Sequence, residues 1–374
     1  MTKETRRTWA EIHLDRLAHN YRALRARAPG SKFVGLVKAN AYGHGAVPVS
    51  EELVRLGTDY LAVACLDEAV ELREAGIKAP IIILGYTPVE YTGELLAYDI
   101  TQTVYDLELA KGFSEAAAAQ GKRLRCHLKA DTGMSRLGVL CTPETMEAAA
   151  DELEAMYRLP GLEPEGLFQH FSDADTCPEY SLMQIERYNA ILKALEDRGC
   201  TFALRHCCAG AATLNYPQVH YDMIRPGIPL YGYVPDHACD GMIELRPVME
   251  VKSRIASVKK LPAGTCISYG RTYTLERDSI VAAVPVGYAD GLNRLLSNRQ
   301  EFMLQGQRVR QIGRVCMDMC MIDVTDLPGE VRVGDVVTVF GEEGLLQEKA
   351  DTVGTITYEM LCAVSPRVPR VFVK

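Results

Sequence analysis

The sequence predicts a (β/α)8 barrel followed by a mostly antiparallel β domain, and three observations support this fold class. The first two thirds of the chain alternate short β-rich runs with helix-like stretches. Eight strand candidates with helices between them fit a closed barrel better than an open doubly wound sheet. Beyond about residue 240 the pattern changes to strands separated by Gly, Pro and Asp turns. We therefore expect a barrel over residues 1–240 and a β domain over residues 241–374.

The expected barrel strands are short, apolar runs of the kind that parallel strands need. They cover residues 32–37, 60–65, 80–85, 100–105, 123–129, 165–171, 203–208 and 222–227. Helix-like stretches lie between them, over residues 47–57, 66–76, 107–121 and 181–199. Asp67 is expected to cap the second of these helices. Glycine stands where three of them should end, at Gly57, Gly76 and Gly199.

The expected β domain contains four strand-rich segments and one helical pattern. The strand-rich segments are residues 245–270, 279–291, 307–326 and 334–341, and the helical pattern covers residues 349–364. Residues 7–15 at the start of the chain also alternate like a strand. This N-terminal segment is a candidate to pair with the β domain rather than with the barrel.

Composition narrows the class of function. A formal net charge of −8 disfavours nucleic acid as a partner, because phosphate binding needs a basic face. No apolar run is long enough to span a membrane, and the start of the chain lacks the apolar core of a secretory signal. The 12 cysteines are scattered, without a CxxC pair, as expected for reduced thiols. The sequence thus predicts a cytoplasmic protein with a small-molecule substrate, and no nucleic-acid or membrane partner.

Ionisable residues close four of the expected strands. Lys38 follows the first strand, Lys129 the fifth, His170 the sixth and Arg225 the eighth. Barrel enzymes carry their active sites at the carboxyl ends of the strands, so these four side chains are expected to converge on one mouth. Each alone is more often solvated or paired, but together they favour a site.

The residue types at this mouth indicate a cofactor. A lysine in a partly apolar pocket loses its proton more readily and can form a Schiff base with an aldehyde. The turn "RPGIPLYG", residues 225–232, offers backbone N–H groups to a phosphate, and Tyr42 adds a hydroxyl near Lys38. Pyridoxal phosphate carries both an aldehyde and a phosphate.

Several motifs resemble the alanine racemase family over nearly the whole chain. "VKANAYGHG" (residues 37–45) resembles the family's cofactor-lysine signature. Further matches are "HLKADTGMSRLG", "RPGIPLYG", "ISYGRTY", "VPVGYADGLNR", "GRVCMDM" and the closing "RVPR". The resemblance implies a homodimer with shared active sites that uses pyridoxal phosphate to interconvert L- and D-alanine and supplies D-alanine for peptidoglycan.

The resemblance also implies roles for the strand-end residues. Inverting a stereocentre means removing a proton from one face and returning one to the other, which requires two acid/base groups. By resemblance, Lys38 binds the cofactor and serves one face, and Tyr269 of the partner subunit serves the other. Arg225 faces the pyridine nitrogen, with His170 linking it to the tyrosine. The further cofactor contacts are expected from Tyr42, Gly210, Gly227 and Ile228.

The substrate side of the site is implied in the same way. Lys129 matches a lysine that is carbamylated in many members. The resemblance implies that this carbamate, an anion, would hold Arg136, and that Arg136 would orient the substrate carboxylate. The alternative is a plain lysine paired with Asp131. Met317 and Asp318 match residues at the substrate end, contributed across the dimer, and Tyr288 matches a residue of the access channel. Their alternatives are core packing for the methionine and an ordinary surface aromatic for the tyrosine.

Two departures from the family pattern bear on the substrate. Where members commonly read "HxANSA", this chain has "HCCAGA", with Ala209 and Gly210 near the expected phosphate. Where many read "SYRVPR", this chain has "SPRVPR", so Pro366 replaces a tyrosine that crowds the substrate side chain. The runs "IILGYT", "TQTVYD" and "TLNYP" also resemble the serine/alanine racemase domains of vancomycin-resistant bacteria. Alanine is therefore the first expected substrate, and serine, alone or beside alanine, is the second.

Two other classes fit parts of the pattern. A pyridoxal-phosphate amino-acid decarboxylase shares the plan of barrel plus β domain, but the "ISYGRTY" tyrosine and Arg136 fit racemisation better. A non-catalytic pyridoxal-phosphate carrier has a single barrel, whereas roughly the last 130 residues here are expected to form a second domain.

Overall fold

The computed structural model describes residues 6–341 and 345–374. It divides into two compact units, each described by itself below. The barrel unit comprises Ala18–Ala41 and Ala46–Leu245, and the β unit comprises Met1–Leu17, Tyr42–Gly45 and Arg246–Lys374. The barrel unit therefore ends at Leu245, and the described N-terminal residues 6–17 group with the β unit.

Eight parallel strands form the barrel, and each contains residues of one expected strand. Their order is β10 (Met223–Ile224), β2 (Lys32–Leu36), β3 (Tyr60–Val63), β4 (Ile81–Ile83), β5 (Ile100–Val104), β6 (Leu124–Asp131), β8 (Leu162–Phe168) and β9 (Leu204–His206). A two-residue strand, β7 (Val139–Leu140), pairs beside β6. The first and last strands are joined by the Arg225 N–H, which donates to the Cys208 carbonyl at 2.8 Å. The predicted barrel is thus confirmed.

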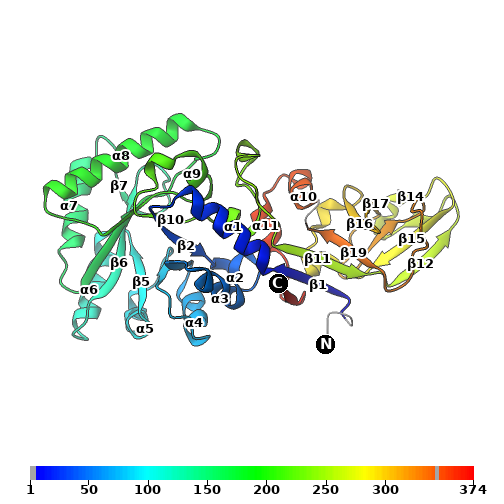
Figure 1. Cartoon of the computed structure of the whole chain (residues 1–374), viewed down its shortest axis with the longest axis horizontal. Coiled ribbons are helices and arrows are strands. Elements are labelled where there is room, and N and C mark those ends of the chain that lie inside the picture. The colour runs from blue at the N-terminus through cyan, green and yellow to red at the C-terminus, as the bar shows by residue number, and fades with distance from the viewer. Residues whose placement is uncertain (1–5, 342–344) are drawn as a thin grey trace. The chain divides into compact units, whose positions relative to one another are not determined.

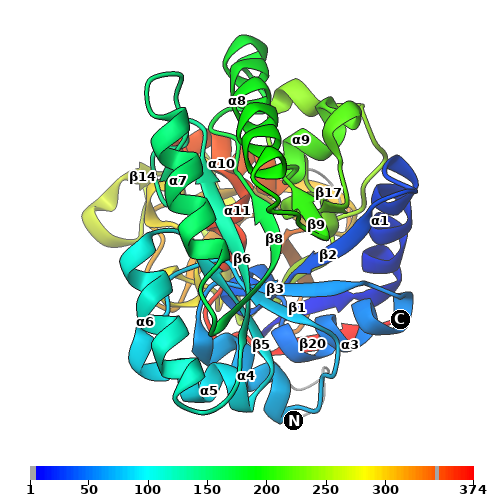
Figure 2. The same ribbon diagram turned by 90° about the vertical axis from the view of Figure 1, so that its left-hand side faces the viewer.

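Helices surround the outside of these strands (Figure 2). They are α1 (Leu14–Arg27), α3 (Ala46–Leu56), α4 (Leu66–Glu74), α5 (Thr92–Ala97), α6 (Leu107–Ala118), α7 (Met146–Tyr157), α8 (Pro178–Asp197) and α9 (Gly210–Asn215). Because helices cover the outer face and side chains fill the inner one, strands such as β4 are buried along their whole length.

One detail of the expected helix ends is wrong and another is right. Helix α4 begins at Leu66 with Cys65 as its N-cap and no side-chain cap, so Asp67 lies inside the first turn. There its carboxylate faces the positive end of the helix dipole. Gly57 and Gly76 follow α3 and α4 with φ of 90° and 91°, the left-handed conformation that ends many helices.

The β unit is built on a nine-stranded sheet that is antiparallel except at one pairing. Its order is β12 (Ser257–Leu261), β15 (Ser279–Val284), β18 (Cys320–Asp323), β17 (Gln307–Ile312), β16 (Glu301–Leu304), β19 (Val336–Phe340), β11 (Met249–Arg254), β1 (Thr8–His13) and β20 (Arg370–Val373). The N-terminal strand β1 pairs antiparallel with β11 and parallel with β20 (Figure 1). The expected antiparallel β domain is confirmed.

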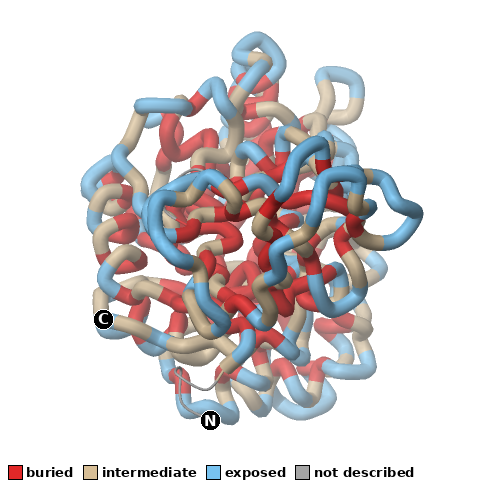
Figure 3. Tube along the Cα trace, turned by 90° about the vertical axis from the view of Figure 1, so that its right-hand side faces the viewer, coloured by how far each residue is buried: buried red, intermediate tan, exposed pale blue. Residues whose placement is uncertain are grey.

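The helical pattern near the C-terminus forms two helices rather than one. Helix α10 (Leu345–Val353) ends at Gly354, whose φ is 69°, and α11 (Thr357–Cys362) begins three residues later. In Figure 3, which faces this unit, buried segments of the trace alternate with exposed ones. All 12 cysteines are unpaired with one another in the structure. No helix in the described part of the chain is long and apolar enough to cross a membrane.

Candidate active site

Lys38 opens a turn of unusual handedness directly after β2. Ala39, Asn40, Ala41 and Tyr42 all have φ of 52–53°, so the turn labelled α2 (Lys38–Tyr42) is a left-handed helical turn built without glycine. Such a conformation costs about 1–2 kcal/mol per residue for L-amino acids. Side chains outside the turn fix part of it, because the Ala39 N–H donates to Glu68 Oε1 at 2.6 Å.

Four cationic side chains converge on one imidazole in the barrel. The pKa of His170 is lowered well below its ordinary value, first by burial and then by the positive charges of Arg225, Arg136, Lys129 and Lys38. The expected strand-end residues are therefore brought within electrostatic range of one another. His170 is neutral at neutral pH because a proton on it would add a fifth positive charge.

Phe168 forms the centre of this cluster. The Arg225 guanidinium lies 5.3 Å from the ring centroid and the Lys129 ammonium 5.4 Å from it. The imidazole of His206 stacks on the same ring, with centroids 4.7 Å apart and an interplanar angle of 5°. Contacts of cations with an aromatic face stabilise positive charge where water is excluded.

A chain of hydrogen bonds runs from Arg225 into the barrel interior. The guanidinium donates to His206 Nδ1. His206 Nε2 lies 2.8 Å from His127 Nδ1, and His127 Nε2 lies 3.4 Å from Glu165 Oε2. The Tyr60 hydroxyl donates to Glu165 Oε1 at 2.8 Å. Because a guanidinium can only donate, each imidazole must accept on Nδ1 and donate from Nε2.

The ionisation states along this chain follow from its environment. Burial lowers the pKa of both imidazoles, and the charge of Arg225 lowers that of His206 further. The pKa of the Glu165 carboxyl is also lowered: burial raises it, but hydrogen bonds from His127 and Tyr60 outweigh that effect. Two neutral imidazoles thus separate a cation, Arg225, from an anion, Glu165.

Arg225 keeps its positive charge without an adjacent anion. Its side chain is buried, and its other hydrogen bonds reach the carbonyls of Gln169 at 3.2 Å and Cys207 at 3.3 Å. Among the described residues, no carboxylate lies within ion-pair distance of it. The buried Nε2 of Gln169, whose backbone carbonyl accepts from Arg225, has no hydrogen-bond partner among the described residues.

Lys129 lies in a setting that makes its ammonium group lose a proton more readily than an ordinary lysine does. Its side chain is buried, and burial together with Arg136 and Arg225 lowers its pKa to about 8. Asp131 is occupied elsewhere, since its Oδ1 accepts the N–H groups of Gly133 at 2.9 Å and Ser135 at 3.0 Å. The charge of Asp131 partly opposes this lowering of the Lys129 pKa, and the lysine–aspartate pair stays an alternative prediction.

Two buried turns in the barrel unit fit a phosphate. Gly210 begins α9, and Gly227 precedes a short helical turn, Ile228–Tyr231. A Cβ added to Gly210 would lie 3.1 Å from Pro229, so the two turns pack against each other. The first N–H groups of a helical turn have no partner within it and bind anions readily. Gly210, Gly227 and Ile228 therefore suit a cofactor phosphate, although the backbone must replace the hydroxyl that a serine at position 210 would supply.

Tyr42, the last residue of the left-handed turn, belongs to the β unit. Its side chain is 6% exposed, and its ring lies 6.1 Å from that of Tyr358. Burial raises the pKa of its phenol, so Tyr42 is a neutral hydroxyl at neutral pH. Its contact with a phosphate stays a prediction.

The remaining expected residues gather on one surface of the β unit. Tyr269, Met317 and Asp318 line a single cavity of about 740 Å³, together with apolar side chains that include Ile267, Met319 and Met321. The ring of Tyr269 is 72% exposed and Met317 is 53% exposed. Exposed apolar side chains gathered on one surface make this surface a candidate interaction site.

Tyr288 is fixed to the same surface through backbone hydrogen bonds. Its N–H donates to the Cys316 carbonyl at 3.0 Å, and the Ala289 N–H donates to the Met317 carbonyl at 3.0 Å. The side chain of Tyr288 is exposed. Three expected substrate-side residues, Tyr288, Met317 and Asp318, therefore belong to one local assembly.

The interior of the barrel site is not predicted by the sequence. The strand patterns place His127, His206, Glu165 and Phe168 only as parts of strands. The available signal was weak: two histidines and a glutamate stand in largely buried strands, where a polar side chain needs a partner. The partners are 38 and 79 positions apart, so nothing local in the sequence pairs them.

Comparison with known proteins covers both units. Residues 12–235 match the family model "Alanine racemase, N-terminal domain", and residues 248–372 match "Alanine racemase, C-terminal domain". The curated protein named alanine racemase 2 from Caldanaerobacter subterraneus subsp. tengcongensis is 45% identical over 380 residues, covering 100% of this chain and 96% of that protein. The alanine racemase of Desulforamulus reducens is 45% identical over 369 residues, covering 98% of each.

Solved structures agree with this assignment. The alanine racemase of Clostridium difficile superposes with a TM-score of 0.93 at 38% identity, covering 99% of this chain and 96% of that one. The Bacillus anthracis enzyme with bound L-Ala-P gives a TM-score of 0.90 at 33% identity, covering 99% and 95%. Relatives and structures matched over both units identify the class of protein as an amino-acid isomerase. The chain belongs to the alanine racemase family, whose members generally depend on pyridoxal phosphate.

Proposed function

We propose that this enzyme uses pyridoxal phosphate to interconvert L- and D-alanine by two-base proton transfer. The observation that carries the proposal is the convergence of Lys38, Lys129, Arg136 and Arg225 around a neutral His170, in a chain that matches the family over both units. Relatives named alanine racemase, at 40–45% identity, support the choice of substrate. The matched β domain also favours this class over a single-barrel carrier or a decarboxylase.

The residues present fit the cofactor. Lys38 offers an amine at the barrel mouth, Arg225 offers an unpaired cation, and the turns at Gly210 and Gly227 offer N–H groups for a phosphate. When bound, pyridoxal phosphate supplies an electron-accepting ring that makes the substrate α-proton acidic. Arg225 cannot give up its proton, so it would keep the facing ring nitrogen unprotonated and limit how much negative charge the ring accepts.

Two side chains would then exchange protons with the substrate Cα. Lys38 would hold and release a proton at Nζ on one face, and Tyr269 of the partner subunit would do so at its hydroxyl on the other. A phenol is a weak base at neutral pH unless positive charge lies near it. The cations around His170 would supply that charge to a tyrosine entering the barrel mouth.

The exposure of Tyr269 supports the shared site. A tyrosine that is 72% exposed, beside exposed Met317 and Met319, leaves apolar surface that a second copy of the chain would cover. We propose a homodimer in which each β unit completes the barrel site of its partner.

The substrate carboxylate would be bound by Arg136. This side chain is exposed, and its positive charge lies close enough to Lys129 to help lower the pKa of that lysine. A carbamate on Lys129 would turn a repulsive neighbour into an anion that holds the guanidinium. Met317 and Asp318 would enclose the substrate from the partner, with Tyr288 in the access channel.

Serine is the second candidate substrate because of Pro366. Proline stands where a tyrosine would crowd the substrate side chain, which leaves room for a hydroxymethyl group. The ratio of kcat/KM for L-alanine to that for L-serine decides between them. The proposed physiological role of this enzyme, which we place in the cytoplasm, is to supply D-alanine for peptidoglycan.

The test combines a spectrum with a racemisation assay. Wild type should show the visible absorbance of a lysine-bound cofactor and form D-alanine from L-alanine. Lys38→Ala should lose both, whereas Lys78→Ala, at an exposed lysine, should keep both. Racemisation by Lys38→Ala at the wild-type rate would overturn the proposal.

A further inference from the structure

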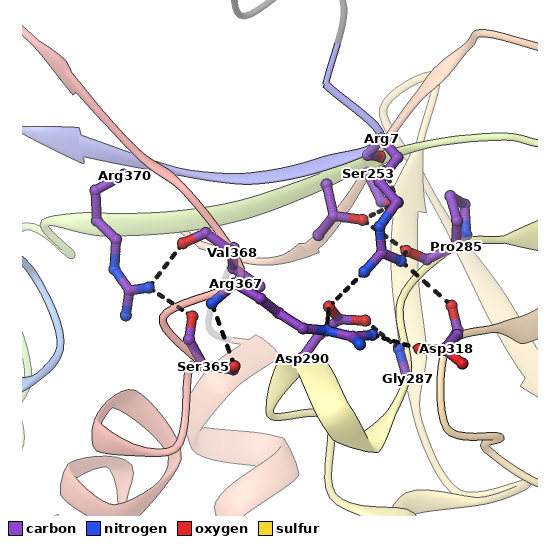
Figure 4. A network of polar contacts seen from close by, with 11 residues as sticks. Arg7, Ser253, Pro285, Gly287, Asp290, Asp318, Ser365, Arg367, Val368 and Arg370 are labelled. Carbon is purple, nitrogen blue, oxygen red and sulfur yellow. Dashed lines mark hydrogen bonds and ion pairs between the residues drawn. The ribbon is translucent and has the colours of Figure 1, made fainter. Parts of the chain in front are cut away.

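The carboxylate of Asp290 is a buried anchor shared by two arginines (Figure 4). Its side chain is 0% exposed, and its Oδ1 accepts from Arg7 at 2.8 Å and from Arg367 at 2.7 Å. Its Oδ2 accepts the Gly287 N–H at 2.9 Å. A buried carboxylate with two cations and a backbone donor is fully paired, so its position is fixed.

Arg367 extends from this anchor to the candidate substrate edge, which we define as Tyr288, Met317 and Asp318. Its Nε donates to Asp290, and its second terminal nitrogen donates to Asp318 Oδ1 at 2.6 Å. One planar guanidinium therefore bridges a buried carboxylate and a half-exposed one. Lysine has a single nitrogen and cannot reproduce this rigid fork.

The segment that carries Arg367 is itself held in place. The guanidinium of Arg370 donates to the carbonyls of Ser365 and Val368, both at 2.7 Å, and to that of Val364 at 2.7 Å. These bonds close the loop on both sides of Arg367. The bridge thus starts from a loop with a defined shape.

The backbone on the other side of the bridge is equally tight. The turn at Tyr288 donates two N–H groups to the Cys316 and Met317 carbonyls. A Cβ added to Gly287 would lie 2.3 Å from the Met317 carbonyl oxygen, so these segments are in direct contact. Tyr288 and Met317 therefore share the Asp290 anchor.

We propose that Arg367 is a positioning residue for the racemisation reaction. Its guanidinium uses Asp290 as a fixed point to hold Asp318, and through it the edge formed by Met317 and Tyr288. This inference rests on the proposed function, because that edge matters only if substrate binds there. Arg367 is not assigned any contact with substrate.

The test is a double-mutant cycle with a structural readout. Arg367→Ala and Asp318→Ala should each lower kcat/KM for alanine, up to about a hundredfold for a misplacement near 1 Å. If Arg367 acts through Asp318, the double variant should be no slower than the slower single variant. Arg367→Lys keeps the charge but not the fork, so it should show a smaller loss, mainly as a raised KM.

Hydrogen exchange tells positioning from general destabilisation. Amides of residues 285–291 and 315–320 should exchange faster in both Arg367 variants, while barrel amides stay protected. Arg332→Ala, which removes an exposed partner of Glu330, should leave kinetics and exchange unchanged. If Arg367→Ala cannot be purified in a folded form, the kinetics and hydrogen exchange of Arg367→Lys test the inference instead.

Three results overturn the inference: multiplicative losses in the cycle, unchanged kinetics in a folded Arg367 variant, or faster exchange spread over the whole chain. Failure of the proposed function is a different result: wild type itself would then not racemise alanine.

Discussion

The guanidinium of Arg225 donates to Nδ1 of His206, so a neutral imidazole, and not a carboxylate, supports the positive charge at the barrel mouth. Arg225→Glu should therefore change the reaction outcome as well as the rate. With an acid near the ring nitrogen, the cofactor accepts more negative charge and transamination of alanine should increase. Pyruvate formed per D-alanine formed is the measurement. Arg205→Ala, at an exposed arginine paired with Asp222, is the control, and an unchanged ratio in Arg225→Glu would contradict this account.

The anionic end of the same chain predicts a pH-dependent stability change. The folded-state pKa of Glu165 is lowered, so its contribution is present above the unfolded value near 4.5 and disappears as pH falls through the folded value. Glu165→Gln should lower the free energy of unfolding by about 1–2 kcal/mol at pH 7. Thermal unfolding of both proteins between pH 3 and 7 should show the difference shrink below about pH 4.5. A constant difference would show that the ionised carboxylate is not the cause.

Carbamylation of Lys129 should depend on pH in a defined direction. Only the neutral amine reacts with carbon dioxide, and with a pKa of about 8 roughly a tenth is neutral at pH 7 and most at pH 9. Carbon-13 NMR with labelled bicarbonate should show a carbamate signal that grows over this range. Lys129→Ala should lack the signal and lose activity, with partial recovery on adding a small carboxylate. Wild type without the signal would leave Arg136 without its proposed anionic partner.

Tyr269→Phe removes the second proposed base and keeps the ring that fills the apolar surface. We expect kcat to fall by about 10²–10⁴, the usual contribution of a general acid/base group, with little change in KM. Tyr273→Phe, four residues along and half-buried, should behave like wild type. Size-exclusion chromatography checks that the dimer persists. Wild-type kcat in a dimeric Tyr269→Phe variant would exclude the phenol as the second base.

A charge on the exposed apolar surface should separate the subunits. Met319 is 45% exposed and lines the Tyr269 cavity, so Met319→Glu should weaken association and reduce activity most at low enzyme concentration. Val333→Glu, at a residue that is 67% exposed and outside that cavity, should have no effect. Sedimentation velocity and specific activity across a dilution series measure both. An active monomer would refute the shared site.

Much of the barrel followed from the sequence because its signals are local. Apolar strand runs and the glycines after α3 and α4 lie within a few residues of what they determine, and the convergence of strand ends is a property of the fold. The pairing of His127 with His206 and the bridge from Arg367 to Asp318 are long-range contacts, which no local pattern encodes. The split between α10 and α11 depends on the backbone at Gly354. Residues 39–42 gave no signal at all, since none is glycine and tertiary contacts override their preference for right-handed backbone.

That left-handed turn has a consequence for mirror-image chemistry. A D-amino acid favours the backbone angles that an L-amino acid avoids, so D-alanine placed at positions 39 and 41 by chemical ligation would adopt the turn without strain. The L-residues adopt it only because the folded chain around them compensates. Ala39 and Ala41, two L-residues next to the lysine proposed to bind the cofactor, are thus held in a backbone conformation that D-residues favour.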